Sequence, residues 1–189
     1  MRIRERPDGR MYSRVLRRAV SIVASIPSSK SMQLDEIVEL LLKRKLPEFY
    51  LMRFKRQISE ARMRDYVRFV RDLGLMKEEA GGYSTRSLPH LKTAEEYAQV
   101  FSDLALEHLA KLIPTPPAQV PSALLKAADR LLESKRVPTI DSVAETLNIG
   151  SGRQRELFRW SLYIYADGEA SKVEVYRYPI ISRKAKGEI

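Results

Sequence analysis

The chain has 189 residues, 44% of them hydrophobic, which is enough for one or two buried cores. It contains no cysteine, so disulfides, thiolate nucleophiles and thiolate metal sites are excluded. Basic residues number 34 and acidic residues 24, and the resulting charge of +10 makes nucleic acid the first partner to test, with an inert basic surface as the alternative.

The N-terminal residues 1–10 hold four arginines, together with Pro7 and Gly9, which break regular structure. We predict a solvated basic arm, which could also lie along DNA. This segment lacks an apolar signal core, and no apolar run approaches the length of a membrane span. We therefore expect a soluble cytoplasmic protein without a membrane partner, associated with the nucleoid if the source is prokaryotic.

Apolar residues recur with a helical period in the first part of the chain. The predicted helices cover residues 11–26, 35–45 and 58–73. The outer face of the first carries Arg14, Arg17 and Arg18. Pro47 marks a break, after which residues 48–56 are predicted as a short basic helical segment.

The third of these helices carries a basic stripe. Arg64, Arg68 and Arg71 recur at spacings of four and three, which places them on one side of the helix. Gly74 ends the helix, and residues 75–85 predict two short strands around a turn at Gly81 and Gly82.

Thr93 and Glu96 form a capping box for a helix over 93–113. Its broad apolar stripe is predicted either to pack on the first hairpin or to form a homodimer with a second chain. The stripe consists of Tyr97, Phe101, Leu104, His108 and Leu112, with Ala94, Ala98 and Ala105 beside them. The next segment, PTPPAQVP (114–121), is predicted to be a stiff, extended linker because four of its eight residues are proline.

The segment from Thr139 to Trp160 predicts two short helices set at an angle. Thr139 can cap the first, and Asn148 can adopt the left-handed conformation that ends it. Ser151 and Gln154 form a capping box for the second. The inner faces are predicted to hold Val143, Ala144 and Leu147 in the first helix, and Leu157, Trp160, Ser161 and Ile164 in the second. The outer face of the second carries Arg153, Arg155, Glu156 and Arg159.

These residues resemble a helix-turn-helix, in which a small residue such as Ala144 lets the two helices pack closely. The chain departs from the usual pattern at Gln154, where most members have a branched apolar residue. Residues 172–178, KVEVYRY, suit a strand, and a turn plus a strand after the second helix is typical of the winged-helix superfamily.

The order helix, short strand, helix, helix, hairpin occurs twice, near 11–87 and near 120–180. The predicted fold is therefore mainly α with small β-hairpins, in two winged-helix domains joined by a helix and the Pro-rich linker. A plain helical bundle with a hairpin is the alternative for the first copy. The predicted divisions are an arm (1–10), a first domain (11–92), a connecting helix and linker (93–120), a second domain (121–182) and a basic tail (183–189).

The resemblance implies that the second helix of each motif enters the major groove of DNA while the wing touches the backbone or minor groove. The free amides around Gly150 and Gly152 could hold a phosphate, with capping by Ser151 as the alternative. The candidate DNA-binding residues are Arg62, Arg64, Arg68, Arg71, Ser151, Arg153, Arg155, Arg159 and Lys172.

No catalytic constellation is apparent in the sequence. The two histidines, His90 and His108, lack metal-ligand spacing, and the chain has neither a G-x-S-x-G motif nor a Walker motif. We therefore expect no enzyme activity, no metal and no cofactor. The leading hypothesis is a double-stranded DNA-binding factor in transcription or replication. The alternative is a protein-interaction scaffold within a larger nucleic-acid-processing assembly.

Overall fold

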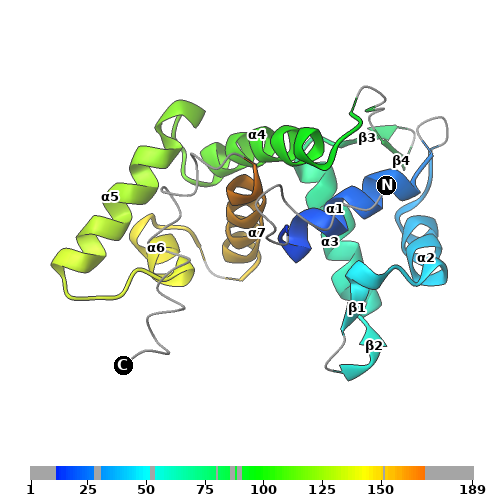
Figure 1. The fold of residues 1–189 in the computed structure, drawn as a ribbon, viewed down its shortest axis with the longest axis horizontal. Helices are drawn as coiled ribbons and strands as arrows, with labels where there is room; N and C mark the ends of the chain where they lie inside the picture. Colours follow the sequence, from blue (N-terminus) through cyan, green and yellow to red (C-terminus); the bar gives the residue numbers. More distant parts are fainter. Residues whose placement is uncertain are drawn as a thin grey trace. The chain divides into compact units, whose positions relative to one another are not determined.

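The computed structural model describes residues 12–27, 31–51, 54–79, 81–85, 88, 91–150 and 152–168. These residues are mainly helical, with two small antiparallel two-stranded sheets (Figure 1), which confirms the predicted fold class at this level. The chain divides into two compact units, residues 1–98 (unit 1) and 99–189 (unit 2). The predicted arm, second wing and tail lie outside the described residues.

Three helices form the core of unit 1, namely α1 (Arg14–Ser25), α2 (Leu34–Arg44) and α3 (Glu60–Asp72). The hydroxyls of Ser13 and Ser59 accept hydrogen bonds from the first-turn amides of α1 and α3, so both helices have side-chain caps. The apolar faces of the three helices bury one another, which removes large side chains from water. The fully buried ones include Leu16, Ile22, Ile37, Leu41, Met63 and Phe69.

The predicted hairpin after α3 is confirmed. Strands β3 (Met76–Glu79) and β4 (Gly82–Thr85) pair antiparallel, with Met76 opposite Thr85. Gly81, in the turn, has a φ of 79°, which glycine adopts without steric cost. Met32, between α1 and α2, adds an isolated antiparallel bridge to Tyr83 in β4, through N···O distances of 2.9 and 2.7 Å. The loop after α1 therefore joins the edge of this sheet.

The prediction of a helix over residues 48–56 is wrong. The segment begins in a 3₁₀ turn, η1 (Pro47–Phe49), which is followed by a β-hairpin of β1 (Tyr50–Leu51) and β2 (Arg56–Gln57). The amide of Ile58 donates to the carbonyl of Phe49, and Lys55 takes a left-handed φ of 50° in the turn. Alternating β-branched and aromatic side chains are too few in this short segment to have revealed the strands.

Unit 2 contains most of α4 (Ala94–Leu112), then η3 (Pro117–Gln119), α5 (Val120–Glu133), α6 (Ile140–Thr146) and α7 (Arg153–Asp167). Three predicted local signals are confirmed. Thr93 and Glu96 exchange capping hydrogen bonds, the hydroxyl of Thr139 caps α6, and Asn148 has a φ of 56° after it. None of the helices in the described ranges combines the length and apolar character needed to cross a membrane.

The prediction of an extended linker over residues 114–121 is wrong, because most of this segment is helical. Pro117 begins the 3₁₀ turn η3, and Pro121 lies in the first turn of α5, which already begins at Val120. Proline is well suited to a helix start because the amide it lacks would have no partner inside the helix. The prolines therefore initiate helical structure here rather than holding the backbone extended.

Two residues of α4 make polar contacts with α7. Ser102 Oγ donates to the carbonyl of Tyr165 at 3.0 Å, and His108 Nδ1 lies 2.8 Å from Ser161 Oγ. Phe101 and Ala105 in the same stripe are fully buried, so this part of the stripe is already covered within one chain. Phe101 and Ala105 therefore offer no exposed surface to a second chain.

The buried face of helix α7 includes more residues than the predicted inner face. Trp160, Ser161 and Ile164 are buried as expected, but Phe158 is fully buried whereas Leu157 is half-exposed. The register of the inner face is thus shifted by one residue at the start of the helix. The helix begins after Gly152, and Ser151, the predicted cap, lies outside the described residues.

Candidate anion-binding pocket

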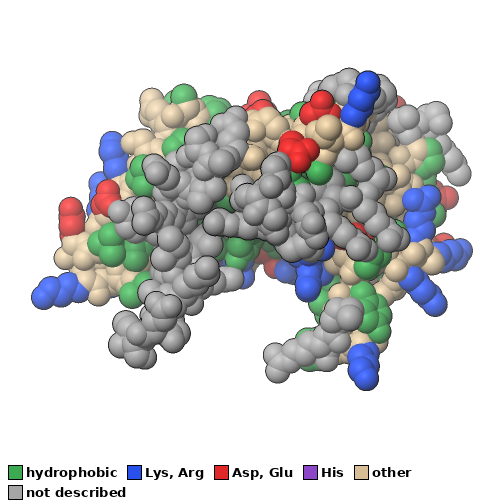
Figure 2. All heavy atoms as spheres, viewed as in Figure 1, with side chains coloured by type: hydrophobic (Ala, Val, Ile, Leu, Met, Phe, Trp, Pro, Cys, Tyr) green, Lys and Arg blue, Asp and Glu red, His purple; other side chains and the backbone are tan. Residues whose placement is uncertain are grey.

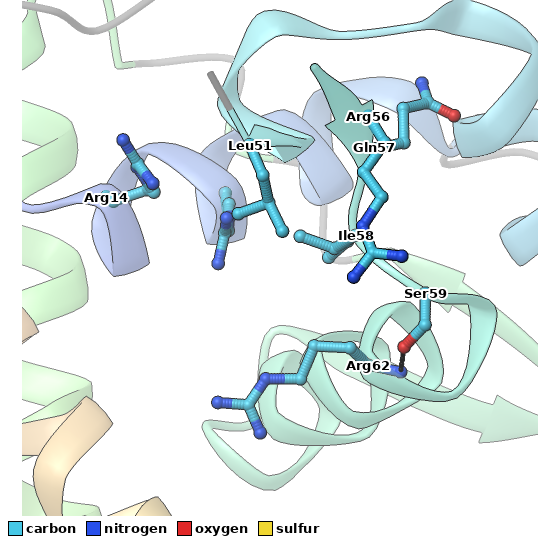
Figure 3. Close-up of a pocket in the computed structure, with 8 residues that line it drawn as sticks. Arg14, Leu51, Arg56, Gln57, Ile58, Ser59 and Arg62 are labelled. Carbon is cyan, nitrogen blue, oxygen red and sulfur yellow. Dashed lines mark hydrogen bonds between the residues drawn. The ribbon is translucent and has the colours of Figure 1, made fainter. Parts of the chain in front are cut away.

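An arginine-lined pocket of about 500 Å³ lies in unit 1, where three elements meet. Figure 3 shows Arg14 from α1, Arg56 from β2 and Arg62 from α3 around one hollow. Arg18 also lines it, and none of its described lining residues is acidic. The remaining lining residues are Leu51, Gln57, Ile58 and Ser59. Four guanidinium groups in one hollow create a site for an anion.

Arg18 forms the buried part of the pocket wall. Its side chain is 6% exposed, although the sequence placed it on the outer face of α1. Its Nε donates to the carbonyl of Glu48 at 2.8 Å and its Nη1 donates to Tyr66 Oη at 2.6 Å. Both acceptors are uncharged, so these bonds orient the guanidinium without neutralising it. Within the described residues, the carboxylate of Glu48 makes no ion pair with Arg18.

The aromatic ring of Tyr66 packs against two of the pocket arginines. The guanidinium of Arg18 lies 4.8 Å from the ring centroid of Tyr66, and that of Arg62 lies 5.6 Å from the same centroid. Phe49 packs edge-on against Tyr66 at 6.5 Å. The negative face of an aromatic ring attracts a cation but leaves its hydrogen-bond donors available. Tyr66 therefore holds the guanidinium groups of Arg18 and Arg62 near each other through its ring.

The pKa of Arg18 is lowered, first because burial penalises its charged form. The charges of Arg14 and Arg62 lower this pKa further, whereas its contacts with Tyr66 raise it. The positive charges of Arg14, Arg18 and Arg62 therefore repel one another across the pocket. An anion bound among them would relieve this repulsion.

The N-terminus of α3 adds to the positive potential. Ser59 is the N-cap, and its hydroxyl accepts a hydrogen bond from the amide of Arg62 (Figure 3). The first turn of a helix carries unsatisfied amides and the positive end of the helix dipole. Among the predicted DNA-binding residues with a described position, only Arg62 lines the pocket.

The predicted stripe on α3 is largely paired with carboxylates. Arg64 donates twice to Asp35 and lies 3.5 Å from Glu60, and the hydrogen bond to Asp35 raises its pKa. Arg71 binds Asp72 at 2.8 Å, and this hydrogen bond likewise raises its pKa. Arg68, the third member, is exposed. The three arginines therefore do not form one unneutralised stripe.

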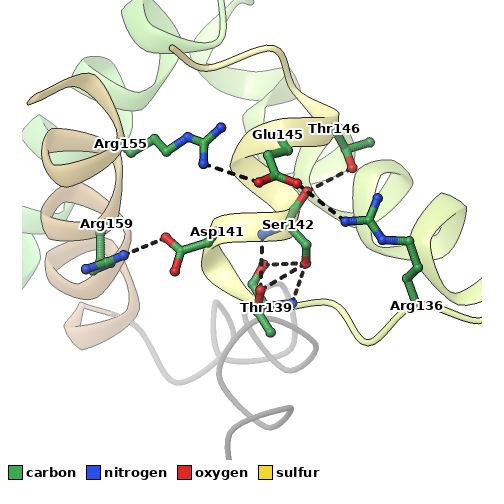
Figure 4. A network of polar contacts seen from close by, with 8 residues as sticks. All are labelled: Arg136, Thr139, Asp141, Ser142, Glu145, Thr146, Arg155 and Arg159. Atoms are coloured by element: carbon green, nitrogen blue, oxygen red, sulfur yellow. Dashed lines mark hydrogen bonds and ion pairs between the residues drawn. The ribbon is translucent and has the colours of Figure 1, made fainter. Parts of the chain in front are cut away.

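The arginines of α7 are also paired. Arg155 Nη1 lies 3.2 Å from Glu145, and Arg159 Nη2 lies 2.5 Å from Asp141, so both reach back to α6 (Figure 4). Arg153 lies 3.9 Å from Glu156 in its own helix and 5.6 Å from the ring centroid of Trp160. The expectation that these side chains point freely to solvent is corrected, because acidic residues of α6 and α7 draw them in.

A second pocket, of about 410 Å³, lies between these ion pairs in unit 2. Its described lining combines two arginines with two carboxylates, so its formal charges cancel. These residues are Asp141, Gly152, Arg155, Glu156 and Arg159. Gly152, one of the two glycines predicted to hold a phosphate, has a φ of 62° and faces this neutral environment. The lining charge therefore favours the pocket of unit 1 as the anion site.

Next to the first pocket, the β1–β2 hairpin carries an exposed aromatic residue. Phe54 is 59% exposed, and its ring centroid lies 5.7 Å from the guanidinium of Arg56, which lines the pocket. In Figure 2 the projection formed by this hairpin shows hydrophobic and basic side chains and no acidic one on its described part. The tip of the β1–β2 hairpin, beside the pocket, is therefore basic and partly apolar.

Three of the four pocket arginines were not predicted as binding residues. Arg18 is three residues after Val15 and four before Ile22, which places it in phase with the buried face of α1. An arginine in that phase could have indicated a buried guanidinium. Arg14 and Arg56 carry no comparable signal, because the hairpin that brings Arg56 to α1 was not predicted.

The described residues contain no group of three or more His, Asp or Glu side chains that could hold a metal ion. Ser151 and Lys172, both predicted to bind DNA, lie outside these residues. No protein-family model, curated protein or solved structure matches the chain.

Proposed function

We propose that the protein binds double-stranded DNA through unit 1, as an accessory factor in transcription or replication. The observation that carries the proposal is the pocket formed by Arg14, Arg18, Arg56 and Arg62, with no acidic residue in its described lining. Lys and Arg side chains that contact phosphates dominate DNA affinity, and arginine binds phosphate oxygens in a bidentate manner.

The order of elements in unit 1 supports a winged-helix arrangement. Helix α1, the bridge at Met32, helices α2 and α3, and the β3–β4 hairpin follow one another as in that superfamily. In this arrangement α3 is the helix that approaches the major groove and β3–β4 is the wing. The pocket at the start of α3 then receives a backbone phosphate, a contact that positions the helix but reads no sequence.

The proposal is tested with a dumbbell duplex, whose two ends are closed by loops, in a fluorescence anisotropy titration. We expect Arg56→Ala/Arg62→Ala to weaken binding by about tenfold or more, because two phosphate contacts are lost. The matched control is Arg155→Ala/Arg159→Ala, which also removes two arginines but from a neutral pocket. Equal effects of the two double variants, or undetectable binding by the unmodified protein, would contradict the proposal.

A protein-interaction role for unit 2 is the second candidate, and a specific surface favours it. Leu132 and Val137 are 46% and 47% exposed on either side of the turn that follows α5. In the same unit, Arg155 and Arg159 of α7 are already paired with carboxylates of α6. A surface with exposed aliphatic groups and balanced charge suits a protein partner better than DNA.

This second role is tested by co-purification from the native source with the tagged full chain. We expect Leu132→Glu/Val137→Glu to lose a partner that the unmodified protein and Arg56→Ala/Arg62→Ala both retain. An identical set of partners for all three proteins would contradict it.

A further inference from the structure

We infer that the arginine pocket and Phe54 together bind a strand end that carries a phosphate monoester, an inference that rests on the proposed DNA-binding function. The phosphate would enter the pocket, and the terminal base would lie against the ring of Phe54. Unit 1 would then distinguish a phosphorylated DNA end from the interior of a duplex.

The position of Arg18 favours a terminal group. Side chains of α1, β2 and α3 line the hollow, and the guanidinium of Arg18, 6% exposed, forms part of its wall. An internal phosphodiester is held by its strand on both sides, so its approach to a buried side chain is more restricted. A terminal phosphate has one covalent attachment and can project inward toward Arg18.

The charge of the pocket favours the same group. A phosphate monoester carries a charge of about −1.5 to −2 at neutral pH and offers three terminal oxygens. An internal phosphodiester carries a single charge. Four guanidinium groups with no described acidic neighbour in the lining can satisfy the larger charge and the additional oxygens. The repulsion that Arg14 and Arg62 exert on Arg18 is relieved most by the more highly charged ligand.

Phe54 supplies the second contact. A single exposed aromatic residue is common on protein surfaces and indicates little by itself. This one lies in a basic hairpin, with its ring 5.7 Å from the guanidinium of Arg56, which also lines the pocket. Bases stack on exposed aromatic rings beside cationic grooves without regard to sequence. At a duplex end, the outer face of the last base pair is free for such stacking.

The test uses the full-length protein and duplexes with one end closed by a loop. The open end carries a 5′-phosphate, a 3′-phosphate or only hydroxyl groups, and a dumbbell without ends completes the set. We expect one phosphorylated end to bind about tenfold more tightly than the hydroxyl end near pH 7.5. This preference should shrink near pH 5.5, because the monoester regains a proton with a pKa of about 6.

The variants separate the two contacts. We expect Arg62→Ala to remove the preference for the phosphorylated end, with Arg14→Ala as a second variant should the first perturb folding. Phe54→Ala should weaken binding to open ends with and without phosphate, while Phe54→Trp should retain it. Arg44→Ala, an exposed arginine of α2 that does not line the pocket, should leave the preference unchanged.

Three outcomes would overturn the inference. Equal affinity for phosphorylated ends, hydroxyl ends and the dumbbell would leave DNA binding in place but remove end recognition. Stabilisation of the unmodified protein, and not of Arg62→Ala, by millimolar inorganic phosphate without any gain for phosphorylated ends would assign the pocket to free phosphate. Absence of binding to every duplex would overturn the proposed function as well.

Discussion

Arg18 shows how one residue organises the pocket. Its guanidinium bonds the carbonyl of Glu48 and the hydroxyl of Tyr66, so it joins α1 to η1 and α3 while it faces the hollow. Burial of a cation among neutral acceptors costs free energy, and the hydrogen bonds and aromatic contacts offset part of this cost. The residue is therefore expected to contribute to both stability and anion binding.

Substitution Arg18→Ala should lower the free energy of unfolding by about 2 to 4 kcal/mol, because it removes buried packing and two hydrogen bonds. Tyr66→Phe removes a single hydroxyl and should cost about 1 kcal/mol. Urea denaturation followed by circular dichroism measures both values. The exposed Arg14→Ala is the control, with an expected change within about 0.5 kcal/mol. A cost for Arg18→Ala no larger than that of the control would contradict this account.

At the scale of elements, the helix pair α6–α7 illustrates how acidic neighbours change the role of arginines. Asp141 and Glu145 lie on α6 at a spacing of four and bind Arg159 and Arg155 of α7 (Figure 4). These side chains are about one-third to one-half exposed, so solvent screens the attraction. The pairs fix the side-chain directions more than they stabilise the fold.

The single substitution Arg159→Ala should therefore lower the free energy of unfolding by less than about 1 kcal/mol. It should also change duplex affinity by less than about twofold, since the pocket that it lines carries balanced charge. Thermal denaturation and anisotropy titrations measure the two effects. A loss of duplex affinity as large as that of Arg62→Ala would show that α7 contacts DNA.

The contact between α4 and α7 is buried, so its loss should destabilise the fold more than the loss of an exposed ion pair. Ser161 is fully buried, and its hydroxyl is 2.8 Å from Nδ1 of His108. Ser161→Ala should cost about 1 to 2 kcal/mol, because the imidazole loses a partner inside the protein. Urea denaturation measures the loss, and Ser122→Ala, exposed on α5, is the control. Equal stability of the two variants would mean that this hydrogen bond makes no net contribution to the free energy of unfolding.

Short-range chemistry accounts for what could be predicted from the sequence. The Thr93 and Thr139 caps, the left-handed Asn148 and the glycine turn between β3 and β4 are all set by neighbours within a few residues. The β1–β2 hairpin was missed because its strands have only two residues each. The pairing of α7 arginines was missed because it depends on how α6 and α7 pack, which periodicity within one helix does not encode.

Across both units, the net charge of +10 predicts a nucleic-acid partner but does not indicate which residues would contact it. Of the predicted binding residues that the structure describes, Arg62 alone lines the basic pocket, while Arg64, Arg71, Arg155 and Arg159 are paired with carboxylates. Charge that is neutralised locally contributes little to attraction at a distance. The described residues of unit 1 therefore carry the proposed interaction with DNA.

The salt dependence of dumbbell binding tests this claim most directly. Each phosphate contact contributes about 0.9 to the slope of log affinity against log salt concentration. We expect Arg56→Ala/Arg62→Ala to reduce this slope by about two units, and Arg155→Ala/Arg159→Ala to leave it unchanged. A slope that is unchanged in the first variant, or reduced equally in both, would contradict the assignment of DNA binding to the pocket of unit 1.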